Sequence, residues 1–420
     1  MSQDVVVVGA GLSGMVAAVR LAEAGVRTAV LAQGVGATHL SPATIDVLGY
    51  TPDLVESPAR ALPSFRTEHP DHPYARLSDD VLSDSLSWLR ELASELGYEG
   101  SVEENVLLPT AVGAAKPSAL VPGAMAAGTL RPGGRFVFVG LRALKSFYPA
   151  YLAENLGQLK LPSGATVQAR AVQLSDPVRE ADLTPLDYAR RFEDPAFRDA
   201  IAKELGPQLE PDEAVGFPAV LGLDRHVEAW AALRDVLGHP VFEVPSLPPS
   251  VPGIRLFRAL RARLRRAGGM LKLGPMVIGT EGGGGTLDAV LTHGAANRPG
   301  RHHARWFVAA TGGFASGAID LASHGELRET VFGLPVVGGP PEGTPRFLPG
   351  YFDDHPLARA GLAVDERLCP VDADGKPVFG NVLAVGATLA GAQPWKEHSG
   401  NGVAVATGYA AASAILEEAG

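Results

Sequence analysis

Three glycines near the N-terminus carry the clearest chemical pattern in the sequence. Gly9, Gly11 and Gly14 stand between the run 4–8, DVVVV, and a segment whose apolar residues recur at helical spacing. Gly9 allows a tight turn, Gly11 lets the backbone approach a phosphate, and Gly14 lets the helix pack on the strand. The free N–H groups and the dipole at the helix N-terminus favour an anion there. We therefore predict a nucleotide-binding βαβ unit.

Two later glycine turns favour a flavin over a nicotinamide cofactor. The predicted strand 305–313 ends at Gly312 and Gly313, and the predicted strand 381–391 contains Gly386. Ligands of open parallel sheets bind at the carboxyl ends of the strands, so we expect both turns beside the first one. A domain that is interrupted by a long insertion and completed by such late strands is typical of flavoproteins. The sequence therefore predicts a flavin, either FMN or FAD.

The segment SGNG at 399–402 is predicted to place further backbone donors against the flavin. Gly400 and Asn401 stand at the start of an Ala-rich helix expected from about 401 to 418. The N–H groups of such a helix start would stabilise negative charge on a reduced flavin. The alternative is that these residues serve only the start of the helix.

Two acidic side chains that often hold the sugar parts of a flavin nucleotide are missing. After the strand 26–32, the place of the ribose-binding carboxylate is taken by Ala32 and then Gln33. Gln33 can make one hydrogen bond there but cannot accept both hydroxyls of a diol as a carboxylate does. Ala387 follows Gly386, where an acidic residue often holds a ribityl hydroxyl. Both departures are compatible with FMN, whereas the complete phosphate turn favours the diphosphate of FAD.

The composition bounds the class of protein. Of 420 residues, 46% are hydrophobic and 20% are charged, which suffices for a large core and two domains. The net charge of −10 argues against a surface that binds nucleic acid. The single cysteine, Cys369, can form no internal disulfide, and we predict no metal site or iron–sulfur cluster. Without a visible secretory signal or a bilayer-spanning apolar run, a cytoplasmic location is expected.

The elements that must position these residues follow an α/β pattern. An amphipathic helix is expected at 78–97, a basic amphipathic helix at 253–269 and a hairpin at 274–292. Between the two helices the pattern changes to a mixture of strands and helices. The strands expected there are 135–140, 165–174, 215–223 and 239–245.

This pattern predicts one domain split by another. We expect a doubly wound, Rossmann-like flavin-binding domain formed by residues 1–105 and 250–420. Residues 106–249 would form an inserted mixed α/β cap or substrate domain. The fold class is thus α/β with a parallel sheet.

The segment QPWKEHSGNG at 393–402 supplies the first candidates for acid–base chemistry. Oxidation of an alcohol by hydride loss needs a base for the hydroxyl proton and, in a phosphorylated substrate, cations for the phosphate. His398 is the candidate base and Lys396 the candidate phosphate clamp, in a loop expected to pass over the flavin. The alternative is that both are solvated loop residues.

Three basic residues elsewhere are further candidates for binding an anionic substrate. Arg255 could bind a phosphate or carboxylate through both arms of its guanidinium. Its alternative role is a salt bridge at a domain interface. Lys116 and Arg142 follow glycine-containing turns and are weaker candidates.

Several segments together resemble the B subunit of anaerobic glycerol-3-phosphate dehydrogenase over nearly the whole chain. They are HLSPATIDVL (39–48), HPY (72–74), FPAVLGL (217–223), LPPSVPGIRL (247–256), ATGGFASGA (310–318) and the C-terminal VGATLAG and GNGVAV. The resemblance implies a flavin subunit, described as FMN-binding, that works with an FAD-bearing catalytic subunit and an iron–sulfur membrane-anchor subunit. It also implies oxidation of glycerol 3-phosphate to dihydroxyacetone phosphate with electrons passed to quinone. A partner would then hold the chain at the inner face of the cell membrane.

The same resemblance draws attention to His39 and Ser41, which are predicted to lie beside the flavin. In the related fumarate reductase group, a histidine shortly after the second strand can bond covalently to the flavin, and His39 stands in a similar place. The alternatives are that His39 lies near the flavin without a covalent bond to it, or that His39 has a purely structural role. The motif HPDHPY at 69–74 contains two histidines but no further ligand set, so it predicts no metal site.

Two functions of different classes follow. The chain is either an enzyme subunit that oxidises glycerol 3-phosphate or a similar polar metabolite, or a non-catalytic subunit that carries an electron-transfer flavin or supports the catalytic subunit. A third possibility is an enzyme acting on dicarboxylates or amines.

Overall fold

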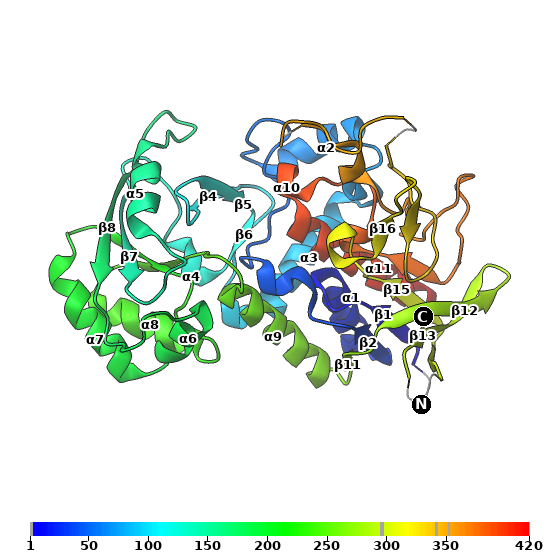
Figure 1. Ribbon diagram of the computed structural model, residues 1–420, viewed down its shortest axis with the longest axis horizontal. Coiled ribbons are helices and arrows are strands. Elements are labelled where there is room, and N and C mark those ends of the chain that lie inside the picture. The colour runs from blue at the N-terminus through cyan, green and yellow to red at the C-terminus, as the bar shows by residue number, and fades with distance from the viewer. Residues whose placement is uncertain (1–2, 295–297, 341–342, 352, 420) are drawn as a thin grey trace. The chain divides into compact units, whose positions relative to one another are not determined.

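The computed structural model describes residues 3–294, 298–340, 343–351 and 353–419 (Figure 1). The chain forms two compact units. Unit 1 comprises Met1–Ala37, Asp46–Leu92 and Ala259–Gly420, and unit 2 comprises Thr38–Ile45 and Ala93–Arg258. Helix α9 (Val251–Arg266) begins in unit 2 and ends in unit 1. The division into a flavin domain and a cap, with the boundaries given above, stays a prediction.

Unit 1 is built on a five-stranded sheet in the order β11-β2-β1-β15-β18, with every pairing parallel. These strands are β1 (Val5–Val8), β2 (Thr28–Ala32), β11 (Met270–Leu273), β15 (Trp306–Ala309) and β18 (Val382–Ala384). The central strand consists only of buried valines, as expected where helices cover both faces of a parallel sheet. The first strand lies in the middle, the second and third on one side, and the fourth and fifth on the other. This is the order of dinucleotide-binding folds, so the predicted fold class is confirmed.

Helix α1 (Leu12–Glu23) connects β1 to β2 and is buried along most of its length. It packs against α11 (Gly400–Ala419), which also contacts α3 (Asp79–Leu92) (Figure 1). The two helices approach closely at Gly408, where a Cβ atom would lie 2.4 Å from the Ser13 carbonyl oxygen. The C-terminal helix therefore fixes the position of the first helix and of the turn before it.

The remaining elements of unit 1 lie outside the five-stranded sheet. A three-stranded antiparallel sheet contains β12 and β13, which form the predicted hairpin, and β14. The bounds are α2 (Pro58–Glu68), β12 (Val277–Gly283), β13 (Thr286–Thr292), β14 (Gly300–His303), β16 (Ile319–Leu321), β17 (Leu327–Glu329) and α10 (Pro394–Glu397).

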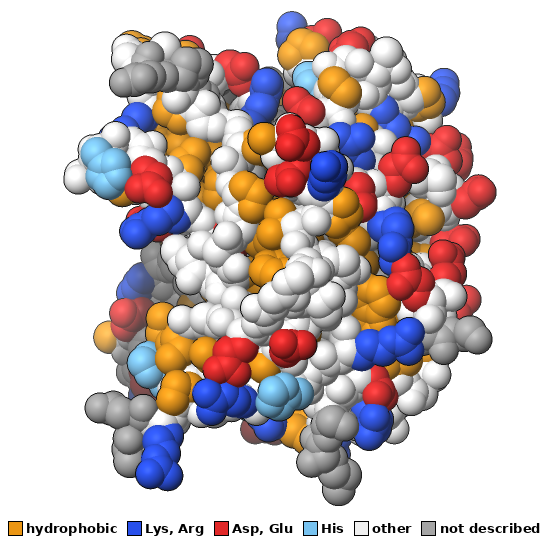
Figure 2. Space-filling view, turned by 90° about the vertical axis from the view of Figure 1, so that its right-hand side faces the viewer, with side chains coloured by type: hydrophobic (Ala, Val, Ile, Leu, Met, Phe, Trp, Pro, Cys, Tyr) orange, Lys and Arg blue, Asp and Glu red, His pale blue; other side chains and the backbone are white. Residues whose placement is uncertain are grey.

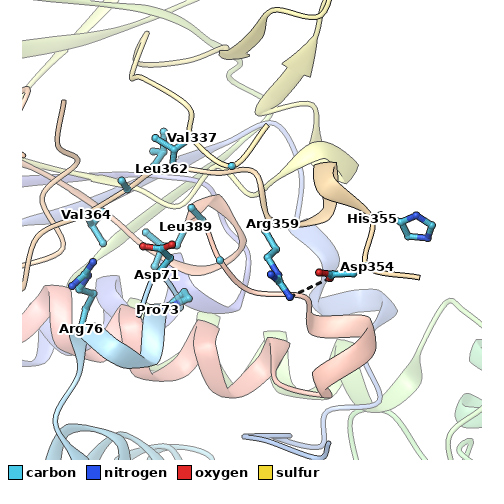
Figure 3. Close-up of a pocket in the computed structure, with 14 residues that line it drawn as sticks. Asp71, Pro73, Arg76, Val337, Asp354, His355, Arg359, Leu362, Val364 and Leu389 are labelled. Carbon is cyan, nitrogen blue, oxygen red and sulfur yellow. Dashed lines mark ion pairs between the residues drawn. The ribbon is translucent and has the colours of Figure 1, made fainter. Parts of the chain in front are cut away.

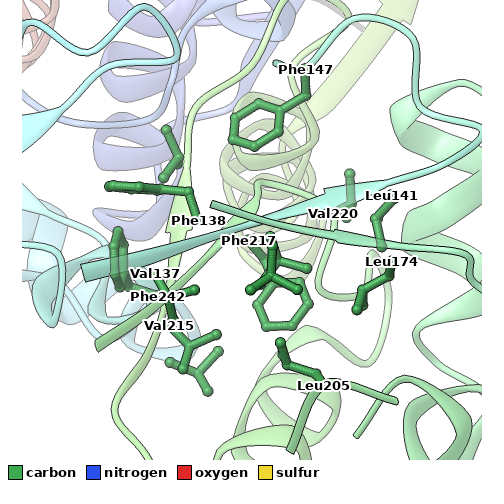
Figure 4. Close-up of a cluster of buried hydrophobic side chains, with 14 of the residues drawn as sticks. Val137, Phe138, Leu141, Phe147, Leu174, Leu205, Val215, Phe217, Val220 and Phe242 are labelled. Carbon is green, nitrogen blue, oxygen red and sulfur yellow. The ribbon is translucent and has the colours of Figure 1, made fainter. Parts of the chain in front are cut away.

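Unit 2 holds a second parallel sheet in the order β10-β9-β7-β8. Its strands are β7 (Arg135–Leu141), β8 (Gln168–Leu174), β9 (Ala214–Pro218) and β10 (Val241–Val244), and each falls within or close to a predicted strand. The buried rings of Phe138, Phe217 and Phe242 fill the core around this sheet (Figure 4). Such aromatic burial supplies much of the apolar contact that stabilises a unit of this size.

Five helices and two short antiparallel strand pairs complete the described part of unit 2. The helices are α4 (Gly123–Ala126), α5 (Pro149–Gln158), α6 (Pro185–Arg191), α7 (Pro195–Leu205) and α8 (His226–Leu237). The antiparallel pairs are β3 (Glu99–Gly100) with β6 (Leu120–Val121) and β4 (Val106–Pro109) with β5 (Ala115–Ser118).

The structure corrects two expectations about elements. The helix predicted at 78–97 ends at Leu92, because the backbone of Ala93 leaves the helical region and Gly97 turns with φ 60°. Leu96 is nevertheless buried, which explains why the apolar periodicity continues to that point. Strand β11 was not predicted, because its four residues, MLKL, show no strict alternation of apolar and polar side chains.

Within the described residues, no helix combines the length and the apolar character needed to cross a membrane. On the face shown in Figure 2, acidic and basic side chains are interspersed, without a continuous basic surface among the coloured residues.

Candidate functional site

Three glycine turns of unit 1 meet at the carboxyl edge of its sheet. The register aligns Val8 of β1 with Ala309 of β15, and Ala309 with Ala384 of β18. The Ala310 N–H donates to the Val8 carbonyl at 2.9 Å, and the Val385 N–H donates to the Ala309 carbonyl at 3.0 Å. The residues that follow these strands therefore stand side by side. This is the place where ligands of such sheets bind.

The first turn leaves no room for side chains at two of its three glycines. Gly9 has φ +115°, and a Cβ atom there would lie 2.1 Å from the Ala310 oxygen. A Cβ atom on Gly14 would lie 2.2 Å from the Gly9 oxygen. Both glycines are therefore required by the close approach of backbone to backbone.

Gly11 differs, because a Cβ atom on it would meet nothing within 4 Å. It is the N-cap of α1, and no side chain caps the first N–H groups of the helix. A phosphate fits such a turn through backbone donors and the helix dipole. Gly36 borders the same turn, since a Cβ atom on it would lie 2.8 Å from the Gly11 Cα. Gly36 was not predicted, although the glycines of QGVG were an available signal.

The other two turns are tied to the first and to each other. Gly386 has φ +74°, and a Cβ atom there would lie 2.4 Å from the Ser13 hydroxyl oxygen. Its N–H donates to Thr407 Oγ1 at 2.9 Å. The Thr388 hydroxyl donates to the Gly312 carbonyl at 2.8 Å. Thr388 and Thr407 were missed because a lone threonine in a sequence carries no signal of such a link.

The space between the second and third turns is narrow. A Cβ atom on Gly313 would lie 2.9 Å from the Ala387 carbonyl oxygen. The predicted residues Gly312, Gly313, Gly386 and Ala387 are thus brought together with Gly9, Gly11 and Gly14. Their direct contact with a flavin stays a prediction.

The end of β2 supplies no acidic group. Ala32 is buried, and its carbonyl accepts the Gly274 N–H at 2.9 Å, whereas Gln33 is exposed. The residues present therefore fit the phosphate part of a flavin nucleotide well. If a ribose binds at this strand end, Gln33 is the polar side chain directly after the strand that would contact it.

The start of α11 is held in unit 1 by close packing and a backbone hydrogen bond. Gly400 is its first residue, and Asn401 follows, as predicted. Gly402 is required by close packing, because a Cβ atom there would lie 2.4 Å from the Tyr74 hydroxyl oxygen. Its N–H donates to the Asp46 carbonyl at 3.0 Å.

Lys396 and His398 lie in a short helical turn rather than in the open loop that was expected. Lys396 is in α10, with its Nζ 3.9 Å from Asp354 Oδ1, and His398 follows in the left-handed region with φ 51°. The His398 ring stands edge-on to Tyr50, with ring centres 5.1 Å apart. The predicted roles of both residues as clamp and base stay predictions.

Between them, Glu397 forms a network that was not predicted. Its carboxylate accepts hydrogen bonds from the Gln393 N–H at 2.9 Å and the Ser399 hydroxyl at 2.8 Å, and lies 3.2 Å from His72 Nε2. Burial alone would raise the pKa of Glu397, but these hydrogen bonds and His72 outweigh burial and hold the pKa below its ordinary value. Within the described residues, no group of three or more His, Cys, Asp or Glu side chains is arranged to hold a metal ion.

Arg255 is placed in unit 2 as half of a buried ion pair. Its guanidinium donates to both carboxylate oxygens of Glu243, at 2.6 and 2.9 Å, and its Nε donates to the Gly222 carbonyl at 2.9 Å. Arg255 and Glu243 are 5% and 2% exposed. Burial opposes the charge of Glu243, but Arg255 prevails and lowers the pKa of that carboxyl. The donors of Arg255 are thus used within the protein, which weighs against its predicted substrate role.

The other candidates of unit 2 also have protein partners. The His39 ring stands edge-on to Phe257 with ring centres 5.0 Å apart, and burial lowers its pKa. Ser41 Oγ accepts the Ala43 N–H at 3.1 Å. Lys116 donates to the Thr44 hydroxyl at 2.8 Å, and Arg142 Nε donates to the Ser175 carbonyl at 2.9 Å. Proximity of His39 and Ser41 to a flavin, and a covalent bond at His39, stay predictions.

Comparison with known proteins places these features in a family. Residues 4–403 match the family described as "FAD binding domain". A protein from Halobacterium salinarum, named as a probable B subunit of anaerobic glycerol-3-phosphate dehydrogenase, is 33% identical over 431 residues, covering 99% of this chain and 98% of the relative. The B subunit of the same enzyme from Pectobacterium carotovorum is 31% identical over 437 residues, covering 100% and 99%.

One solved structure of similar extent is 3-ketosteroid Δ1-dehydrogenase from Sterolibacterium denitrificans. It shares 12% identity with a TM-score of 0.47, covering 99% of this chain and 100% of that one. A similarity at this level supports no inference about the present chain. The family match, by contrast, confirms the predicted flavin class of cofactor, and the full-length relatives confirm the predicted resemblance. The chain therefore belongs to the FAD-binding family of oxidoreductases and, within it, to the family of B subunits of anaerobic glycerol-3-phosphate dehydrogenase.

Proposed function

We propose that this chain is the FAD-bearing B subunit of a glycerol-3-phosphate dehydrogenase complex. The proposal is carried by the full-length relatives of that name together with the complete phosphate turn, which suits a diphosphate. The complex would oxidise sn-glycerol 3-phosphate to dihydroxyacetone phosphate and pass electrons to quinone. A catalytic FAD-bearing subunit and an iron–sulfur membrane-anchor subunit would be its partners, and the anchor would hold the chain at the inner face of the membrane.

The chain's own residues would bind the cofactor mainly through the backbone. The N–H groups that follow Gly11 would hold the phosphates, and the turns at Gly312 and Gly386 would border the ribityl chain and the ring. The N–H groups at Gly400 and Asn401 would face the pyrimidine side of the ring. A bound flavin supplies the acceptor for the two electrons that leave the secondary alcohol.

The alcohol also loses a proton from its hydroxyl, which requires a base. His398 remains the candidate, because it ends α10 beside the half-buried Glu397 network. The Glu397 carboxylate binds the Gln393 N–H and the Ser399 hydroxyl, which lie on either side of His398 in the chain. Lys396 would then face the phosphate of the substrate only if it leaves the vicinity of Asp354.

A second candidate function is an electron-transfer subunit without substrate chemistry of its own. This function is favoured because basic residues that were predicted to bind the substrate already lie beside acidic side chains of the protein. Arg255 is bound to Glu243, and Lys396 lies near Asp354. Such a subunit would still need the flavin site but no base.

The first experiment identifies the cofactor released from the purified chain by acid, by its mass. FAD supports the proposal, and FMN would replace FAD in it. A polypeptide that contains no flavin and takes up none when supplied would contradict both candidate functions. Yellow colour that remains with the precipitated protein would indicate a covalent bond, for which His39 is the candidate.

The second experiment separates the two functions by measuring reduction of the bound flavin, which is seen as bleaching of its yellow colour. Glycerol 3-phosphate should bleach the flavin of the purified chain alone if the chain is itself catalytic. Bleaching that occurs only after addition of the catalytic subunit would indicate electron transfer. Turnover with dicarboxylates or amines in place of glycerol 3-phosphate would favour the third possibility.

A further inference from the structure

A cavity of about 410 Å³ lies wholly within unit 1 (Figure 3). Its apolar wall includes Val337, Leu362, Val364 and Leu389. Leu389, Ala390 and Gly391 of this wall directly follow the 3₁₀ helix Gly386–Thr388, which forms the third glycine turn. The cavity therefore adjoins the segment that borders the proposed flavin site. Its volume lies within the range of small-molecule sites.

Arg76 is the notable charged residue of this cavity. It is half-buried, and no hydrogen bond or ion pair links its guanidinium to any other residue in the described part of the chain. Asp71 also lines the cavity, but it is exposed and forms no ion pair with Arg76 among these residues. The donors of the Arg76 guanidinium are therefore not used by any of these residues. An anion that enters the cavity would find them available for charge-assisted hydrogen bonds.

The HPY motif at 72–74, to which the sequence analysis assigned no function, holds the backbone of Arg76 in place. Arg76 is the last residue of the 3₁₀ helix Pro73–Arg76, which His72 caps by accepting the Tyr74 N–H at Nδ1, 3.1 Å away. The Tyr74 hydroxyl donates to the Val47 carbonyl at 2.8 Å, and both rings are buried. The short helix is thus anchored at its start while its last side chain lines the cavity.

The far side of the cavity is positively charged as well, but its charge is already compensated. In the view of Figure 3, Arg359 and Arg76 stand on opposite sides of Asp71 and Leu389. Arg359 lies 3.1 Å from Asp354, which also accepts a hydrogen bond from Gln393 at 2.7 Å and lies 3.9 Å from Lys396. Among the cavity's arginines, Arg76 is therefore the one available to an anion.

We propose that this cavity binds a small phosphate monoester, with Arg76 as the side chain that receives the phosphate. The apolar wall would cover the carbon skeleton, and the polar groups around Asp354 would face its hydroxyls. The phosphate monoester rests on the proposed function, whereas the anion site rests on the cavity and Arg76 alone. The site is distinct from the one first expected, because it involves neither Arg255 nor Lys396 as the anion contact.

The test is isothermal titration of the full flavin-loaded chain with glycerol 3-phosphate, inorganic phosphate, succinate and glycerol. For Arg76→Gln we expect the affinity for glycerol 3-phosphate and for phosphate to fall about tenfold or more, since a charge-assisted hydrogen bond is lost. Glycerol, which lacks the anion, should bind the variant and the natural chain equally. Arg60→Gln is the matched control, because Arg60 is an exposed arginine of α2 that lies outside the cavity and has no side-chain partner among the described residues.

Two further variants keep the test decisive if Arg76→Gln is unstable. Arg76→Lys keeps the charge and should lose only part of the affinity, and Ala363→Leu should weaken binding by filling the cavity without altering a charge. Unchanged binding of glycerol 3-phosphate in the folded variants, or absence of phosphate binding to the natural chain, would overturn the proposal. Binding of succinate alone would overturn the choice of a phosphate monoester.

The same variants separate this proposal from the proposed function. If glycerol 3-phosphate binds through Arg76 but bleaches no flavin with or without the catalytic subunit, the cavity stands and the proposed function fails. If bleaching proceeds equally in the natural chain and in Arg76→Gln, the proposed function stands and the cavity assignment fails.

Discussion

His72 Nε2 lies 3.2 Å from Glu397 Oε2, and this pair joins two distant segments of unit 1. Because Nδ1 of His72 accepts the Tyr74 N–H, the proton of the neutral ring is on Nε2 and is donated to Glu397. The carbonyl of Glu397 in turn accepts the Gly49 and Tyr50 N–H groups, at 2.8 and 3.1 Å. The segment that carries Lys396 and His398 is therefore held by hydrogen bonds on several sides.

We predict that Glu397→Gln lowers the free energy of unfolding by about 1–3 kcal/mol at neutral pH, because the charge-assisted hydrogen bonds are weakened. The pKa of Glu397 is lowered by folding from an ordinary value of 4.5. Its contribution is therefore complete above pH 4.5 and is lost as the pH falls through the lower folded pKa. Urea unfolding at a series of pH values should show the difference from the natural chain shrinking below pH 4.5. The matched control is Glu68→Gln, an exposed residue of α2, and an equal effect there would contradict the prediction.

Two glycines of the phosphate turn should differ in how much stability the chain loses when each is replaced by alanine. Gly9→Ala requires φ +115° and meets the Ala310 oxygen at 2.1 Å, so we expect a loss of stability of about 2 kcal/mol or more. Gly11→Ala meets nothing within 4 Å, so we expect a change of about 1 kcal/mol or less. If Gly11 faces the phosphates, Gly11→Ala should nevertheless weaken flavin binding. Thermal unfolding and flavin absorbance after dialysis measure the two effects, and a stable, fully flavin-loaded Gly11→Leu would contradict the assignment.

Much of the fold followed from local patterns. The all-valine β1, the spacing of Gly9, Gly11 and Gly14, and the hairpin around Gly284 are each specified by a few neighbouring residues. The meeting of the three turns was also predicted, because parallel strands place their carboxyl ends at one edge. Tertiary packing against α11 then fixes positions such as Gly402 and Gly408, which local patterns do not reveal.

The side-chain network was harder to predict, since its partners are distant in sequence. His72 and Glu397 are 325 residues apart, and neither has a sequence context that indicates the other. Arg255 shows the converse case, in which a partner could not be foreseen. Its place in a distinctive segment suggested substrate binding, whereas Glu243 supplies the partner that only the folded chain reveals. Arg76 was overlooked because a single arginine after HPY is indistinguishable from a solvated one until the cavity is seen.

For the buried pair in unit 2 we predict that Arg255→Met destabilises the chain by about 3–5 kcal/mol, because it leaves the Glu243 carboxylate buried without its partner. The double variant Arg255→Met/Glu243→Leu should recover most of that loss, since replacing both charges removes the uncompensated group. Urea unfolding of the single and double variants measures the coupling. A stable Arg255→Met chain that has lost affinity for glycerol 3-phosphate would instead support the substrate role first considered for Arg255.

The strand end after β2 offers a way to decide between FAD and FMN. Gln33 is exposed and directly follows Ala32, at the position where a carboxylate usually accepts the ribose hydroxyls of a dinucleotide. If FAD is the cofactor, Gln33→Glu should strengthen its binding by about 3- to 10-fold through a second hydrogen bond to the diol. FMN lacks the adenosine ribose, so its affinity should not rise. Quenching of flavin fluorescence on titration of the flavin-free chain measures both affinities. Equal effects on FAD and FMN, or none on FAD, would mean that the adenosine does not lie at the end of β2.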